Sequence, residues 1–442
     1  MQIRPKAKSR KFKPNSKKQK RVLHAKTRHA IQSFTEHFKN LNGGAGDENE
    51  RSAYFYNLDN VVDMRRMGSD SVNSVVNALE YDDGSFAVLK TSKQAEGDNL
   101  MYELAVGSFV NHLCRVLPNF IRTYGAFTCD ASTHAGLLES SLGALTSLSD
   151  LLDYNSAKAC DPQLHTSLLV EHVTNPISVF DLSPDDLSFN LIGVLFQVYF
   201  ALSSVCKVFT HYDLHDENVL LYARNDGKHL DFVYVDETGQ TAFKCKYAVK
   251  IIDYGHSFFV DKINNTSSAK LIKEAACRLT QSGDYVNPLV SNCSHDLRFF
   301  YICKTKQSIR FRLQKNKLFK AARLTLDMLN TDLAYESEFG TPSRKSQAHS
   351  KTILNVADAY RALTHVMRTN KATFDEGFAS SAPAGTLTVN ALTGFNFVEA
   401  SIPKPKAAQG LLKFSLEDSD LDDSDLDDMG LGNMKIGGFK FS

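Results

Sequence analysis

Apolar and polar positions alternate in short runs through the first third of the chain. Five runs have the length and pattern of β-strands: 60–67, 72–80, 86–90, 119–127 and 167–173. Asp82-Asp83-Gly84-Ser85 is a strong hairpin signal between the second and third runs. A helical period covers 99–117. This order predicts a small β-rich region that contains one helix.

Helical patterns dominate the next part of the chain. The longest apolar stretch, Leu187 to Phe209, predicts a helix buried on most of its surface. Ser183 is suited to cap its start and Pro184 to occupy its first turn. One hairpin is predicted within 232–244. Three further helical patterns follow: 295–304, 306–331 and 351–369.

Charge is concentrated at the two ends of the 442-residue chain. Residues 1–30 contain twelve Lys or Arg and no acid, whereas residues 417–428 contain eight Asp or Glu and no base. Such runs are typical of solvated tails. We expect the basic arm to attract nucleic acid or an acidic partner. Residues 371–411 are rich in small residues and Pro, which predicts a linker before the acidic tail.

The remaining composition indicates an intracellular protein with a folded core. Hydrophobic residues make up 43% of the chain, and none of the eight Cys forms a C-x-x-C pair. No secretory signal begins the sequence, and no run of about eighteen apolar residues predicts a membrane span. We expect a cytoplasmic or nuclear location. The sequence does not indicate an oligomeric state.

Two polar stretches carry the chemistry. The first is His211-Tyr-Asp-Leu-His-Asp-Glu-Asn218, and the second is V-K-I-I-D-Y-G, which contains Asp253. One carboxylate that orients a hydroxyl, together with an amide and a second carboxylate that hold Mg²⁺, is the inventory of phosphoryl transfer. Asp213, Asn218 and Asp253 supply that inventory.

Lys90 ends an apolar strand, and Glu103 lies in the helical pattern that follows. Taken singly, Lys90 is typical of a strand end whose ammonium reaches water, and Glu103 of a solvated helix face. Taken together they predict an ion pair, because a buried Lys that contacts phosphates needs a carboxylate to fix it.

The order of these segments resembles the eukaryotic protein kinase fold over residues 58–370. The motif H-Y-D-L-H-D-E-N is most similar to the corresponding motif of divergent serine/threonine kinases of large DNA viruses. The resemblance implies an α+β, bilobal fold with a small β-rich N-lobe and a larger, mainly helical C-lobe. The implied divisions are a basic arm with a short helix, the N-lobe, the C-lobe, and a linker with the acidic tail: 1–57, 58–173, 174–370 and 371–442.

The resemblance also implies roles for the five residues nearest the chemistry, with ATP and Mg²⁺ as cofactors. Lys90 would contact the phosphates of ATP and pair with Glu103. Asp213 would be the catalytic base. Asn218 and Asp253 would bind Mg²⁺.

Other matched positions would support the nucleotide and the loop. His211 would brace the catalytic loop near Asp253. Glu171 and Val173 would offer backbone groups to adenine, and Val75 and Val88 would close over the ring.

Several positions depart from the family pattern. The glycine-rich loop over the phosphates has only Gly68, and Tyr212 replaces the Arg that usually precedes the catalytic Asp. His215 stands where these kinases place a catalytic Lys, and Tyr254 replaces Phe, a mild change. Asp296 matches the helix Asp that holds the catalytic loop from below.

Three functions are compatible with these features. The first is a serine/threonine protein kinase that uses ATP and Mg²⁺ on a protein substrate. The second is a kinase-fold binding or virion structural protein with little activity, which the sparse glycines and the missing A-P-E motif favour. The third is a small-molecule phosphotransferase, which His215 favours. If the chain is viral, association with the virion is expected.

Overall fold

The structure is a computed structural model that describes residues 53–67, 74–93, 100–139, 148, 152–154, 165–224, 226–274, 289–334 and 352–400. Contacts divide the chain into two compact units, Met1–Ala400 and Ser401–Ser442. All described residues belong to the first unit. The predicted basic arm, Gly68 and the acidic tail lie outside the described residues.

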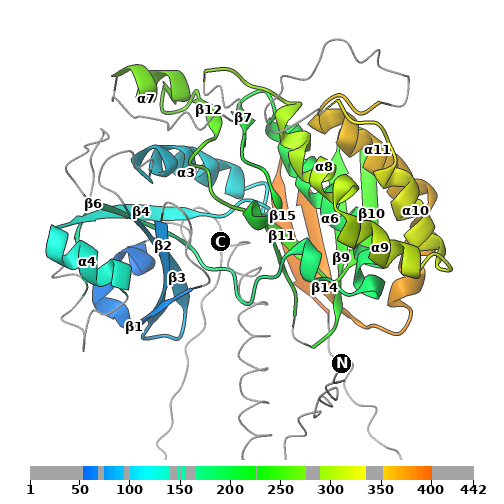
Figure 1. The fold of residues 1–442 in the computed structure, drawn as a ribbon, viewed down its shortest axis with the longest axis horizontal. Helices are drawn as coiled ribbons and strands as arrows, with labels where there is room; N and C mark the ends of the chain where they lie inside the picture. The colour runs from blue at the N-terminus through cyan, green and yellow to red at the C-terminus, as the bar shows by residue number, and fades with distance from the viewer. Residues whose placement is uncertain are drawn as a thin grey trace, which may run out of the picture. The chain divides into compact units, whose positions relative to one another are not determined.

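The first part of the described chain forms a six-stranded antiparallel sheet with the order β1-β2-β3-β6-β4-β5 (Figure 1). Its strands are β1 (Val61–Arg66), β2 (Ser74–Tyr81), β3 (Phe86–Ser92), β4 (Thr123–Cys129), β5 (Asp153–Tyr154) and β6 (His165–Glu171). The predicted turn joins β2 to β3, where Gly84 has a φ of 78°. The predicted β-rich N-terminal region is therefore confirmed.

Helices pack against both faces of this sheet. Successive strand residues point to opposite faces. Leu168 lies in one apolar cluster with Leu100 of α3 (Leu100–Cys114). Leu169 lies in another cluster, with Leu137 of α4 (Ala131–Glu139). The sheet is thus buried from two sides, and α3, which contains Glu103, covers the face on which Lys90 lies.

Helix α6 (Pro184–Val205) is the centre of the second part. The Ser183 side chain accepts a hydrogen bond from the amide of Asp186, as a helix cap does. By length and composition α6 could also cross a membrane, but 83% of its apolar window is buried inside the protein. We therefore assign α6 as the buried core helix that its apolar run predicts.

Further helices follow α6 in the chain: α7 (Ser268–Glu274), α8 (Arg298–Thr305), α9 (Gln307–Lys315), α10 (Lys320–Leu329), α11 (Val356–Thr369) and α12 (Lys371–Asp375). Helices α8 to α12 lie around α6, whereas α7 lies apart from it, beside β12 (Phe258–Asp261) and β13 (Thr266–Ser267) (Figure 1). Five short 3₁₀ turns also lie in the described part of the chain: Leu58–Asn60, Val179–Asp181, Asp216–Asn218, His295–Leu297 and Glu376–Phe378. The single helical pattern predicted over 306–331 is in fact two helices, because the chain turns at 316–319.

A second sheet, with the order β10-β9-β14-β15, corrects the expectation of a linker over 371–411, while the later region is mainly helical as predicted. β9 (His229–Asp236) and β10 (Gly239–Cys245) form the predicted hairpin. However, β14 (Pro383–Asn390) and β15 (Gly394–Glu399) arise from the segment predicted as a linker. Their small residues permit close strand packing, since a Cβ at Gly385 would lie 2.6 Å from a backbone oxygen. The later region therefore combines helices with a sheet.

Short strands hold the two chemistry-bearing segments side by side. They are β7 (Phe209–Thr210), β8 (Val219–Tyr222), β11 (Ala248–Ile251), β12 (Phe258–Asp261) and β13 (Thr266–Ser267). β8 pairs with β11, and β7 pairs with β12. The loop between β7 and β8 therefore lies beside the loop between β11 and β12, and these loops carry the two motifs.

Candidate active site

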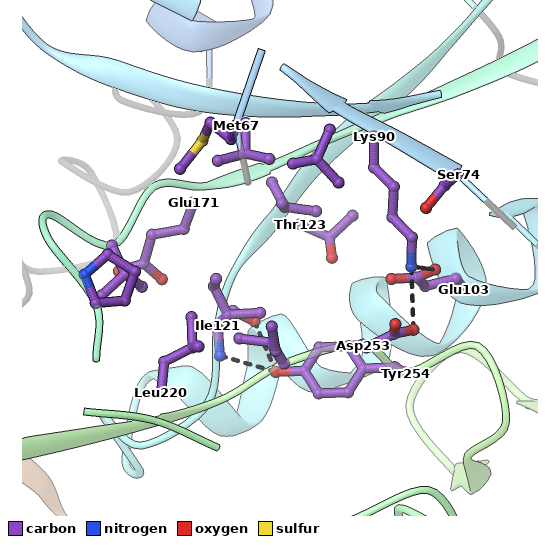
Figure 2. A pocket seen from close by; sticks show the side chains of 16 residues that line it. Met67, Ser74, Lys90, Glu103, Ile121, Thr123, Glu171, Leu220, Asp253 and Tyr254 are labelled. Atoms are coloured by element: carbon purple, nitrogen blue, oxygen red, sulfur yellow. Dashed lines mark hydrogen bonds and ion pairs between the residues drawn. The ribbon is translucent and has the colours of Figure 1, made fainter. Parts of the chain in front are cut away.

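A cavity of about 800 Å³, counted with its open mouth, lies under the N-terminal sheet (Figure 2). Most of its walls are apolar: Val76, Val88, Ile121, Val170, Leu220 and Ile252. Figure 2 shows Lys90, Glu103 and Asp253 gathered on one side of the cavity and Glu171 on the other. An apolar cavity with a few convergent polar groups is the usual form of a small-molecule site.

Lys90 connects β3, α3 and the second motif. Its Nζ donates to a Glu103 carboxylate oxygen at 2.8 Å and to an Asp253 oxygen at 3.0 Å (Figure 2). Burial lowers the pKa of Lys90, but the charges of Asp253 and Glu103 outweigh that effect and raise it above its ordinary value. The ammonium is therefore fixed as a cation at the cavity wall, as the predicted pair with Glu103 requires.

Asp253 occupies a strained backbone position at the end of β11. Its φ is +64°, which non-glycine residues rarely adopt and which functional sites often contain. Burial raises the pKa of Asp253, but the nearby Lys90 ammonium outweighs it, so the pKa is lowered and the carboxylate is ionised. The next residue, Tyr254, fixes this turn through its hydroxyl, which contacts Ile121 and Ile251 at 2.8–3.0 Å.

The 211–213 backbone is fixed from two directions. Asp296 is buried and accepts the amides of His211 and Tyr212 at 2.8 and 2.9 Å. Burial raises the pKa of Asp296 to about 7, against the opposing effect of these two amides. His211 is neutral because burial lowers its pKa, and its Nε2 donates to the Ile252 carbonyl at 2.8 Å. Tyr212 has a φ of +63°. The loop is thus held in one strained conformation.

Asp213 lies at the centre of a group of polar contacts. Its Oδ1 accepts from Arg298 at 2.7 Å, and its Oδ2 lies 3.4 Å from the Asn218 amide nitrogen. Asn218 also donates to the Asp213 carbonyl at 2.8 Å. Burial would raise the pKa of Asp213, but the His215 side chain outweighs it through a hydrogen bond and its charge. The pKa is well below its ordinary value, so the carboxylate is ionised.

His215 faces the predicted base Asp213 and the predicted metal ligand Asn218. Its Nε2 lies 3.6 Å from Asp213 and 3.1 Å from the Asn218 amide, while its Nδ1 accepts the Glu217 amide. Burial lowers the pKa of His215, but Asp213 outweighs that effect and raises it. His215 therefore lies where a cation beside the catalytic carboxylate is expected, although its charge depends on pH.

Asn218 and Asp253 are the candidate ligands for a divalent cation. The two lie on adjacent loops, since the Ile252 amide donates to the Asn218 carbonyl at 3.1 Å. Across the residues that the structure describes, no cluster of three His, Cys, Asp or Glu could hold a metal. Two oxygen ligands fit Mg²⁺, which usually combines one or two carboxylates with substrate phosphates and water. They do not fit a preformed cage such as a structural zinc site.

The predicted nucleotide contacts are placed as follows. Val88, Glu171 and Val173 line the cavity. The prediction for Val75 is off by one residue, because Val76 lines the cavity and alternation in β2 turns Val75 to the other face. Gly68 lies outside the described residues, so its predicted role stays a prediction.

Two cations at the site, the buried Lys250 and the partly buried Arg298, were not predicted from the sequence. Lys250 lies 3.0 Å from Glu171, which lines the cavity, and Arg298 contacts Asp213. Lys250 belongs to the motif V-K-I-I-D-Y-G. A Lys inside an apolar strand could have indicated a buried ion pair, because Lys is rarely buried without a partner. Arg298 has no comparable signal, since a basic residue near a helix start is common.

Comparisons with known proteins bear on the fold only weakly. No protein-family model matches the chain, and no curated protein matches it. Among solved structures, the kinase PK-1 of the Cydia pomonella granulovirus is similar at 15% identity and a TM-score of 0.25. The match covers 50% of this chain and 66% of that one, just under two thirds. The kinase-like interpretation below therefore depends on the geometry of the site.

Proposed function

We propose that this protein transfers a phosphoryl group from Mg-ATP to serine or threonine hydroxyls of a protein substrate. One observation carries the proposal: Lys90 bridges Glu103 and Asp253 in the wall of the cavity. A Lys that is paired with a helix carboxylate and lies beside a metal-binding Asp is the phosphate-binding arrangement of protein kinases. Residues 163 positions apart form this arrangement here.

The cavity supports the nucleotide part of the proposal. Its apolar walls, including Val76, Val88 and Leu220, suit a flat nucleobase. Backbone groups of Glu171 and Val173 at the far side would orient that base. Lys90 would then contact the phosphates, with Asn218 and Asp253 holding Mg²⁺, which neutralises charge on the phosphates when bound.

Asp213 is suited to act on the hydroxyl. Its pKa is well below the ordinary value, so it is ionised at neutral pH and can accept a hydrogen bond from a serine or threonine hydroxyl. The fixed backbone of 211–213 holds this carboxylate in one place. In this mechanism Asp213 would orient the nucleophile and take its proton as the new oxygen–phosphorus bond forms, while the bond from the γ-phosphorus to the bridging oxygen breaks and ADP leaves.

The assignment of protein hydroxyls rests on the order of the sequence motifs. Asp296 supports this assignment, because Asp296 contacts the catalytic loop in the way that the resemblance to protein kinases implies. The competing interpretations are a nucleotide-binding protein without transfer and a phosphotransferase for small molecules.

Radiolabelled ATP and acidic and basic model proteins test the proposal, with the full chain and its Asp213→Asn variant side by side. We expect Mg²⁺-dependent labelling by the wild type and a large loss in Asp213→Asn. Equal labelling by the two proteins would refute phosphoryl transfer at this site. A thermal-shift titration with Mg-ATP separates the alternatives, since a ligand of the folded state raises its stability. Labelling of free amino-alcohols or sugars alone would identify a small-molecule enzyme.

A further inference from the structure

The Asp213 carboxylate has a permanent cationic partner from outside its own loop. Arg298 is the first residue of α8, and its Nη1 lies 2.7 Å from Asp213 Oδ1. The Arg298 side chain is 14% exposed and the Asp213 side chain 28% exposed, so water screens this pair only in part. Charge-assisted hydrogen bonds of this length are among the stronger side-chain contacts.

The position of Arg298 is set by the same turn that holds the loop backbone. Asp296, two residues earlier, accepts the amides of His211 and Tyr212. Leu297, which lies between Asp296 and Arg298 in the chain, is fully buried. One short segment therefore contacts both the backbone of the catalytic loop and the side chain of its central carboxylate. A two-point attachment of this kind restricts the Asp213 rotamer as well as the loop.

Charge around Asp213 shows why such a cation matters. Ionisable groups face it from several segments: His211, His215, His256, Asp253 and Arg298. His215 carries charge only when protonated, and the His211 ring is neutral. A guanidinium stays charged over the whole working range of pH. Arg298 is therefore the constant positive charge on the Asp213 carboxylate.

We propose that Arg298 is a positioning residue of the phosphoryl-transfer site, where it holds the Asp213 carboxylate in place in a loop that lacks the usual catalytic Lys. This inference rests on the proposed function. It divides the work of one absent Lys between two side chains. Arg298 fixes the carboxylate, and His215 contacts Asn218.

The test compares Arg298→Gln and Arg298→Lys with the wild type in the full chain, and uses Arg323→Gln as a matched control at an exposed position in α10. For Arg298→Gln we expect a fall in kcat of roughly 10- to 100-fold, because a misplaced reacting group costs about that much. The KM for ATP is expected to stay unchanged. Arg298→Lys is expected to recover part of the rate.

An unchanged or increased kcat in Arg298→Gln would overturn the inference. A second measurement does not depend on activity. Melting temperatures of the wild type, Arg298→Gln, Asp213→Asn and the double variant form a cycle. We expect non-additive shifts, and additive shifts would overturn the pairing. If the wild type and Asp213→Asn label substrates equally, the proposed function fails, while the melting cycle still decides whether Arg298 holds Asp213.

Discussion

Lys250 lies 3.0 Å from Glu171, which lines the cavity, and both side chains are buried. Lys250 also donates to the Phe120 carbonyl at 3.1 Å, and Glu171 accepts the Arg122 amide at 3.0 Å. Lys250 lies in β11, three residues before Asp253, and Glu171 is the last residue of β6 at the cavity wall. The pair therefore connects these two strands. A buried ion pair with these additional hydrogen bonds fixes the two segments relative to each other.

Removing one partner of this pair is expected to destabilise the protein strongly. In Lys250→Met, the Glu171 carboxylate would stay buried without its cation. Breaking a buried pair in this way costs about 3–5 kcal/mol. Urea unfolding of Lys250→Met measures the loss, and Lys317→Met at an exposed position serves as the control. Equal unfolding midpoints for the two variants would show that the pair contributes little.

Loss of the Lys90 ammonium is expected to abolish the response to nucleotide. Lys90→Met removes the cation that Asp253 and Glu103 share, so phosphates lose their contact at the cavity wall. We expect the thermal shift produced by Mg-ATP to disappear and transfer to fall by roughly 100-fold or more. Glu103→Gln, which keeps a polar partner for Lys90, should have a smaller effect. A normal Mg-ATP shift in Lys90→Met would exclude Lys90 as a phosphate contact.

The His215–Asp213 pair predicts a specific pH dependence of stability. The pKa of His215 is raised above 6.5 in the folded state, so its stabilising effect is complete below pH 6.5 and is lost as pH rises through the raised value. The pKa of Asp213 is lowered below 3.8, so its contribution is present above pH 3.8 and is lost as pH falls through the lowered value.

Melting curves of the wild type and His215→Gln, recorded from below pH 6.5 to well above it, test this dependence. We expect the wild-type advantage to be largest on the acid side of that range and to shrink as pH increases. A difference that stays constant across the range, or that grows with pH, would contradict the pairing.

The Tyr254 hydroxyl is expected to contribute to stability, although Tyr in place of Phe at this position is a mild change by sequence alone. It is buried and hydrogen-bonds the Ile121 amide at 2.8 Å and the Ile251 carbonyl at 2.9 Å. In Tyr254→Phe these buried backbone groups would lose a partner, at a cost of about 1–3 kcal/mol. Chemical denaturation measures that cost. An unfolding free energy within error of the wild type would mean that water replaces the hydroxyl without loss.

The sequence by itself determined the local elements and the chemistry they carry. Gly84 follows two Asp in a turn, and Ser183 with Pro184 begins α6, because caps and turns depend on residues close in the chain. The spacing of Asp213 and Asn218 sets one loop, so their relationship was predictable too. The Lys90–Glu103 pair followed from chemistry, since a buried ammonium requires a carboxylate.

Only the tertiary structure decided relationships between distant segments. β14 pairs with β9 across roughly 150 residues, and its small side chains resemble a linker until a partner strand is in place. Val76 rather than Val75 faces the cavity because strand register, which a one-residue shift reverses, is fixed by pairing with β3. Arg298 reaches Asp213 because Asp296 fixes the turn before α8 beneath the loop. Local patterns specify which side chains are available, whereas packing of the whole chain selects the pairs that meet.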